Sequence, residues 1–315
     1  MSFAKRTVLR LAASLLLVVS LSAVSLAAGP RDFPSPDAAA AALAAAAHAD
    51  DARALIGILG SGGRKLVYSG DRVADQHGRA QFAAAYDASH TIELQGDAKA
   101  ILVIGQNEWP FPIPLVKRGA SWRFDTKAGA QEILNRRIGR NELSAIQVVR
   151  AYVDAQLDYA SADRQADGLR EYAQHFMSSP GKHDGLYWPA AAGEPESPIG
   201  PLVADARAQG YGPAAKGETA QPHRPQPYHG YYYKILTRQG PHAPGGALDY
   251  VVNGHMIGGF ALVAYPAKWG DSGIMTFIVN QDGVVYQKNL GPRTATLARA
   301  IAEYDPDPSW AKQQP

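Results

Sequence analysis

The feature that most constrains the fold is a β-rich stretch between His229 and Leu290. Its runs are dominated by aromatic and β-branched residues, which suit a pleated, half-buried surface. Two of the runs are separated by Asn280-Gln281-Asp282-Gly283, and Asp-Gly tolerates the positive φ of a tight turn. The stretch therefore predicts an antiparallel meander of three or four strands. It indicates no activity.

The first 27 residues have the pattern of a secretory signal peptide. A basic start with Lys5, Arg6 and Arg10 precedes the apolar run Leu11 to Val24, and Ser25-Leu26-Ala27 offers small residues for cleavage. The run is shorter than the ~20 residues that a membrane-spanning helix needs. We therefore expect cleavage and a periplasmic or secreted protein, the alternative being an uncleaved anchor. No other apolar run is long enough to span a membrane.

Charge and cysteine content exclude several classes of partner and site. The chain has 31 basic and 29 acidic residues and no basic block of the kind that binds nucleic acid. It has no cysteine, which excludes disulfides, thiolate nucleophiles and cysteine-based metal sites. No phosphate-binding or dinucleotide-binding motif is present, so we expect no cofactor.

The order of predicted elements indicates an α+β chain of two small domains, each with helices packed on an antiparallel meander. In the first domain, residues 28–139, three helices are followed by strands between Thr91 and Phe124. Ser35 is expected to cap the first helix, and Lys65 to Tyr68 to form a short strand. A helix from Thr126 to Ile138 closes this domain, and we place the boundary near Gly139.

The second domain, residues 140–315, is expected to begin with a separate helix, Glu142 to Ala160. Its apolar residues recur at three- and four-residue spacing and predict one buried stripe, made of Leu143, Ile146, Val149, Val153 and Leu157. A Pro- and Gly-rich segment, 177–228, follows with one short helix, Leu202 to Ala208. After the meander, Pro292 to Tyr304 is expected to be a helix with Leu297 and Ile301 facing inward.

Five motifs together resemble the bacterial domain-of-unknown-function family 2950, over nearly the whole chain from Phe33 to Trp310. They are Ser178-Ser179-Pro180-Gly181-Lys182-His183-Asp184-Gly185-Leu186-Tyr187-Trp188-Pro189, Ser197-Pro198-Ile199-Gly200-Pro201, Gly230-Tyr231-Tyr232-Tyr233, Trp269-Gly270-Asp271-Ser272-Gly273 and Phe277-Ile278-Val279-Asn280-Gln281-Asp282-Gly283. The resemblance implies a secreted bacterial protein of unassigned activity. It supplies no catalytic residues.

The second domain is also similar to type IV pilin-like globular domains. The order of a long amphipathic helix, a variable loop and a terminal meander with an Asp-Gly turn carries this similarity. Pilins use an N-terminal apolar helix for assembly, whereas this helix is internal and polar on one face. The similarity therefore concerns the fold rather than filament assembly.

The segment that combines the most chemistry lies in the Pro- and Gly-rich loop. A base, acids and aromatic rings stand close together in Lys182, His183, Asp184, Tyr187, Trp188, Glu194 and Glu196. Charged and aromatic residues on a loop suit a ligand-binding or acid–base site. The alternative is that Tyr187 and Trp188 anchor the loop to the core while the charges are solvated.

Two other patterns contain the residue types of a catalytic or metal site but lack the rest of its motif. Gly270-Asp271-Ser272-Gly273 matches the serine motif of chymotrypsin-like proteases, but their histidine motif is absent, so we expect a turn. Six histidines lie between His175 and His255 without the close pair of a zinc motif: His175, His183, His223, His229, His242 and His255. We expect no metal site, since one would require the fold to gather His183, His229 and Asp184.

The sequence thus supports two functions of different class. The first is a non-catalytic envelope or secreted binding module with an unknown envelope ligand or protein partner, in keeping with the export signal and the missing catalytic constellation. The second is a hydrolase that acts on a cell-envelope polymer through the loop 182–196. No catalytic residue is assigned for either.

Overall fold

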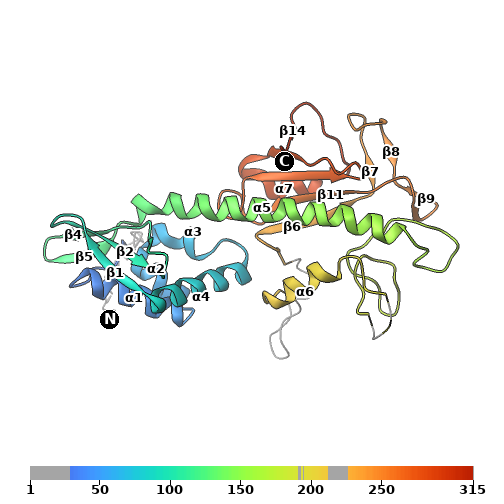
Figure 1. The fold of residues 1–315 in the computed structure, drawn as a ribbon. Coiled ribbons are helices and arrows are strands. Elements are labelled where there is room, and N and C mark those ends of the chain that lie inside the picture. Colours follow the sequence, from blue (N-terminus) through green and yellow to red (C-terminus); the bar gives the residue numbers. More distant parts are fainter. Residues whose placement is uncertain (1–28, 191–192, 194, 212–225, 315) are drawn as a thin grey trace, which may run out of the picture.

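The computed structural model describes residues 29–190, 193, 195–211 and 226–314. The fold is α+β, as predicted, and consists of two lobes in which helices pack on an antiparallel sheet (Figure 1). Their hydrophobic cores are separate: one draws on residues between Phe33 and Phe124, the other on residues between Ala145 and Tyr304. Among the described residues, no helix is long and apolar enough to cross a membrane. The predicted signal peptide lies outside them.

The N-terminal lobe places its helices before its sheet. Ser35 caps the first helix as predicted, because its hydroxyl accepts the Ala38 N–H at 3.1 Å. The sheet is antiparallel in the order β1-β2-β4-β5, with β3 paired to β2. The elements are α1 Pro36–His48, α2 Ala52–Leu59, η1 Ser61–Gly63, α3 Arg64–Val67, α4 Arg72–Ala88, β1 His90–Leu94, β2 Lys99–Ile104, β3 Trp109–Pro110, β4 Leu115–Arg118 and β5 Ser121–Phe124.

The predicted strand from Lys65 to Tyr68 is wrong, because the segment forms the short helix α3. A helix of one turn leaves its carbonyl groups without intrahelical partners. Arg137, 71 and 72 residues away, donates to two of them, Lys65 O at 2.9 Å and Leu66 O. This long-range support has no local sequence signal.

One helix, α5 Thr126–Ala160, replaces the two helices expected on either side of Gly139. It runs from the N-terminal lobe along the whole C-terminal lobe (Figure 1). Glycine inside a helix costs about 1 kcal/mol relative to alanine. That cost is small beside the packing of both halves of α5. The domain division near Gly139 stays a prediction, and a continuous helix crosses it.

The buried stripe of α5 differs at its ends from the predicted one. Ile146, Val149 and Val153 are buried as expected, but Leu143 and Leu157 are 65% and 49% exposed. The helix instead buries Tyr152, Gln156 and Tyr159. The reason is the helical period: these residues continue the face of Val149 at spacings of three and four, and Leu157 lies one position off it.

The C-terminal lobe contains the predicted meander. Its sheet has the order β14-β13-β12-β11-β6 with antiparallel neighbours, and α5 and the short helix α7 pack against its strands. Gly283 turns between β12 and β13 with φ of 71°. The elements are α6 Gly200–Ala208, β6 Tyr231–Leu236, β7 Arg238–Gln239, β8 Leu248–Asp249, β9 Val251–Val252, β10 His255–Met256, β11 Ala261–Pro266, β12 Met275–Asn280, β13 Tyr286–Asn289, η2 Gly291–Arg293, α7 Thr294–Ala300 and β14 Ala311–Lys312.

The helix predicted over Pro292 to Tyr304 is shorter than expected, since only α7 is α-helical. Its fully buried apolar residue is Ala298, whereas Leu297 is exposed and Ile301 is half-buried just past the last turn. The chain leaves the helix at Ile301 in an extended conformation. The expected inward pair is therefore wrong at Leu297.

The buried carboxylate of Asp71 joins the two lobes. Asp71 caps α4 by accepting the Ala74 N–H at 3.1 Å. Its other oxygen accepts the Tyr211 hydroxyl and the Gly230 N–H, both at 2.8 Å, from the C-terminal lobe. One side chain thus satisfies groups of both lobes.

A second connection forms where the turn before β12 meets α5 and α3. Asp271 is buried and pairs with Lys268 of the same turn and with Lys65 of α3 at 3.6 Å. On α5, Asn141 donates to Ser272 O at 2.8 Å, and Glu142 accepts the Ile274 N–H at 2.8 Å. These contacts fix the middle of α5 to the C-terminal sheet.

Candidate functional site

Three segments meet at the C-terminal end of α5: the loops 161–171 and 178–188 and the hairpin of β9 and β10 (Figure 1). We call this region the α5-end site. At its centre, the buried Tyr159 donates its hydroxyl to His183 O at 2.6 Å. Burial raises the pKa of Tyr159, and the nearby Glu171 and Asp184 carboxylates raise it further. Tyr159 is therefore a neutral hydrogen-bond donor that positions the loop.

The aromatic residues of the predicted loop are anchored in the core. Trp188 is 3% exposed and donates its indole N–H to Pro195 O at 3.2 Å. His183 stacks on Trp188 with ring centroids 4.3 Å apart, and the Arg164 guanidinium lies 5.8 Å from the same ring. Tyr187 is also buried. The structure thus brings His183 and Trp188 together, with an arginine that the sequence did not indicate.

The charged residues of the loop have different environments. Lys182 and Glu196 are exposed. Asp184 accepts the Ser179 N–H at 2.7 Å. Desolvation acts to raise the pKa of Asp184, but the hydrogen bonds from Ser179 outweigh it and hold that pKa below its usual value. Asp184 is thus ionised and engaged in its own turn, while Glu194 lies outside the described residues.

The Gly270-Asp271-Ser272-Gly273 motif forms a turn, as predicted. Gly270 N–H donates to Gly273 O at 2.9 Å, and Gly270 has φ of 76°. The buried Ser272 hydroxyl accepts the Lys268 N–H at 2.9 Å and donates to Lys268 O at 3.2 Å. This serine is therefore part of the turn that holds Asp271 against α3.

The histidines considered for a metal site are in different environments. His183 stacks on Trp188, whereas His229 lies before β6 against Tyr211 and Tyr228, where burial lowers its pKa. His223 lies outside the described residues.

Within the described part of the chain, the potential ligand atoms that approach one another closely belong to Asp167, Glu171 and His255, all within 4.8 Å. We call these three residues the carboxylate–histidine cluster. The sequence interpretation missed it. The polar run from Asp163 to Glu171 is the local feature that could have pointed to the cluster. His255 could not be connected with it from the sequence, because it follows 84 residues after Glu171.

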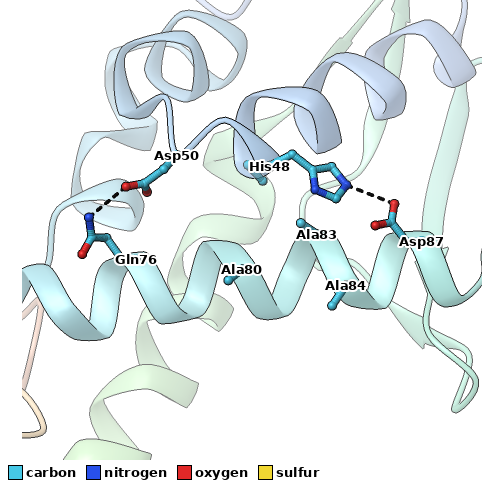
Figure 2. Close-up of a pocket in the computed structure, with 8 residues that line it drawn as sticks. His48, Asp50, Gln76, Ala80, Ala83, Ala84 and Asp87 are labelled. Atoms are coloured by element: carbon cyan, nitrogen blue, oxygen red, sulfur yellow. Dashed lines mark hydrogen bonds and ion pairs between the residues drawn. The ribbon is translucent and has the colours of Figure 1, made fainter. Parts of the chain in front are cut away.

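A groove in the N-terminal lobe is a second candidate location. It has a volume of about 410 Å³ and lies between α1 and α4 (Figure 2). Its floor is made of alanines, and its polar groups pair at the rim: His48 with Asp87 at 3.0 Å and Gln76 with Asp50 at 2.9 Å. The lining residues are Ala47, His48, Asp50, Gln76, Ala80, Ala83, Ala84 and Asp87. No predicted ligand-binding residue lines it.

Comparison with known proteins identifies one family. A family model described as "Protein of unknown function (DUF2950)" matches residues 30–313. This is the family that the sequence motifs resemble. No curated protein and no solved structure matches the chain. The similarity to pilin-like domains is therefore not shown.

Proposed function

We propose that this chain, which belongs to the DUF2950 family, is an exported bacterial protein that binds a component of the cell envelope through its α5-end site, without catalysis. The observation that carries the proposal is the packing of the loop 178–188. Its aromatic rings are anchored in the core, while Lys182 is exposed and His183 half-buried. A rigid base under accessible polar groups is an arrangement that favours recognition at low entropic cost.

The state of Asp184 favours binding over hydrolysis. A general acid at neutral pH needs a raised pKa. The pKa of Asp184 is instead lowered by the Ser179 hydrogen bonds, which outweigh its desolvation, and its carboxylate accepts the Ser179 N–H. The Ser272 hydroxyl is likewise bonded within its turn. Asp184 and Ser272, two of the side chains considered for catalysis, are thus used to shape their own loops.

The binding proposal is tested with the protein purified after export of the full-length chain. Purified peptidoglycan and envelope polysaccharide fractions are incubated with it, and the retained protein is measured as a function of concentration. We expect saturable retention that Lys182→Glu weakens about tenfold, a loss of about 1.4 kcal/mol. Lys127→Glu is the matched control, because Lys127 is an exposed lysine of the N-terminal lobe. Its retention should equal that of the unaltered protein.

Two results would overturn this proposal. One is the absence of retention on every envelope fraction. The other is turnover of a fraction that is lost in His183→Ala while the melting temperature is unchanged, which would establish the hydrolase instead.

Export is tested by cell fractionation and N-terminal sequencing of the isolated protein. Cleavage after Ala27 predicts a mature chain that begins at Ala28 in the periplasmic or culture fraction. Recovery of an uncleaved chain in the membrane fraction would contradict this expectation.

A further inference from the structure

We infer that Asp167, Glu171 and His255 form a binding site for one divalent transition-metal ion, with Zn²⁺ the best match. The cluster lies within the α5-end site but uses none of the predicted loop residues, and the inference does not depend on the proposed binding function. It combines two carboxylates with one imidazole, and the three residues come from the loop 161–171 and from β10.

The spacing of the donor atoms suits a small ion. His255 Nδ1 lies 3.3 Å from a Glu171 oxygen and 3.8 Å from an Asp167 oxygen. Two ligands bound to Zn²⁺ at about 2.0–2.1 Å in tetrahedral geometry are themselves about 3.3 Å apart. An ion can therefore be accommodated with small side-chain movements.

Hydrogen bonds from neighbouring groups hold the carboxylate of Glu171 and the loop of Asp167 in place. Glu171 has a side chain only 4% exposed; one carboxylate oxygen accepts the Met256 N–H at 3.2 Å, and the other accepts the Gln165 amide. Asp163 fixes the loop that carries Asp167, because it accepts the Gly168 N–H at 2.9 Å. Such bonds orient metal ligands in protein sites.

The other side of the cluster faces solvent. The Asp167 and His255 side chains are 34% and 35% exposed. An ion can therefore enter, and water can complete its coordination, as in zinc sites with three protein ligands.

The donor types select the kind of ion. Ca²⁺ and Mg²⁺ take oxygen ligands, whereas imidazole nitrogen suits zinc and its neighbours. The metal and a proton compete for His255 Nδ1, so binding releases any proton held there. Without a metal, a protonated His255 would pair with the two carboxylates, and this ion pair is the alternative that an experiment must exclude.

The test is calorimetric titration of the exported protein, stripped with a chelator, with ZnCl₂, MnCl₂ and CaCl₂ in separate runs. We expect one Zn²⁺ per chain and a higher melting temperature with zinc. His255→Ala and Asp167→Asn should each weaken zinc binding at least about tenfold, since even outer-shell changes cost 10–100-fold. Two variants are used so that a folding defect in one, checked by circular dichroism, does not decide the outcome.

His242→Ala is the matched control. His242 also pairs through Nδ1 with a carboxylate, Asp305 at 2.9 Å, but among the described residues it belongs to no group of three closely spaced ligand side chains. Its zinc affinity should equal that of the unaltered protein. The inference is overturned if no zinc binds, if Ca²⁺ binds and Zn²⁺ does not, if both cluster variants bind normally, or if His242→Ala loses binding equally.

Discussion

Gln156 satisfies the backbone groups of Ala173 inside the C-terminal lobe. Its amide accepts the Ala173 N–H and donates to the Ala173 carbonyl, both at 2.8 Å, and it donates to the Tyr152 hydroxyl at 3.0 Å. Gln156→Leu leaves these buried groups without partners, so we expect a loss of about 3 kcal/mol in the free energy of unfolding. Urea denaturation measures it. Gln131→Leu, on the exposed side of the same helix, should change stability by less than about 0.5 kcal/mol.

The pair of His242 and Asp305 makes a contribution to stability that depends on pH. The hydrogen bond that His242 donates to Asp305, together with the charge of that carboxylate, raises the pKa of His242 above the usual 6.5. The pair therefore stabilises the folded protein fully below that value and loses its contribution as the pH rises through the folded-state pKa. Proton NMR should place the His242 midpoint above 6.5 in the unaltered protein. In Asp305→Asn the midpoint should return toward 6.5; an unshifted midpoint in both proteins would contradict the role of Asp305.

The candidate site could be predicted from the sequence only in part, because its contacts join distant segments. His183, Asp184 and Trp188 could be selected because charged and aromatic residues lie close together in the sequence. The alternative that Trp188 anchors the loop followed from its being a large aromatic residue. The stacking partner Arg164 and the donor His255 are positioned by the fold, 24 and 67 residues from Trp188 along the chain. No periodicity or motif connects them.

At the scale of elements, substitution to alanine should have opposite effects on stability at two glycines of α5. A methyl group at Gly139 meets nothing within 4 Å, whereas one at Gly129 would lie 2.2 Å from Pro112 O. Gly139→Ala should therefore raise the free energy of unfolding by about 0.5–1 kcal/mol through helix propensity. Gly129→Ala should lower it by about 1–3 kcal/mol through overpacking. Thermal and urea unfolding of both variants test this pair, and a shared sign would refute it.

The strands and most helices followed from local patterns, and the errors at α3 and at the break in α5 share one cause. The meander was predictable because side-chain alternation, aromatic content and the Asp-Gly turn all act within a few residues. The helix α3 and the unbroken α5 depend on contacts from elsewhere: Arg137 satisfies the carbonyl of Lys65, and both lobes pack on α5 across Gly139. A prediction from local sequence includes the cost of Gly139 in a helix but not the packing of α5 on either side of it.

At the scale of the whole molecule, the lobes are joined by a helix and by carboxylates that serve both sides. Asp71 of the N-terminal lobe accepts the Gly230 N–H, and the buried Asp271 of the C-terminal lobe pairs with Lys65 of α3. Glu142 in the middle of α5 accepts the Ile274 N–H. Asp71 and Asp271 each have one partner in their own lobe and one in the other, so docking of the lobes is coupled to the local turn or cap that each acid stabilises.

Asp71→Ala tests this coupling, with Asp51→Ala as its matched control. Both acids cap helices, Asp51 at α2 and Asp71 at α4, but Asp51 is exposed and its carboxylate accepts N–H groups of its own helix, those of Arg53 and Ala54. Loss of the Asp51 cap should cost about 1 kcal/mol. Loss of Asp71 should cost about 3 kcal/mol, because the buried Tyr211 hydroxyl and Gly230 N–H lose their acceptor as well.

Hydrogen exchange distinguishes this coupling from a simple capping defect. In Asp71→Ala, the amide of Gly230 and the start of β6 in the C-terminal lobe should exchange faster, although the substitution is in the N-terminal lobe. Asp51→Ala should leave that region unchanged and speed exchange only in α2. Faster exchange confined to α4 in Asp71→Ala would mean that the lobes dock without this carboxylate, through α5 and the pairing of Asp271 with Lys65.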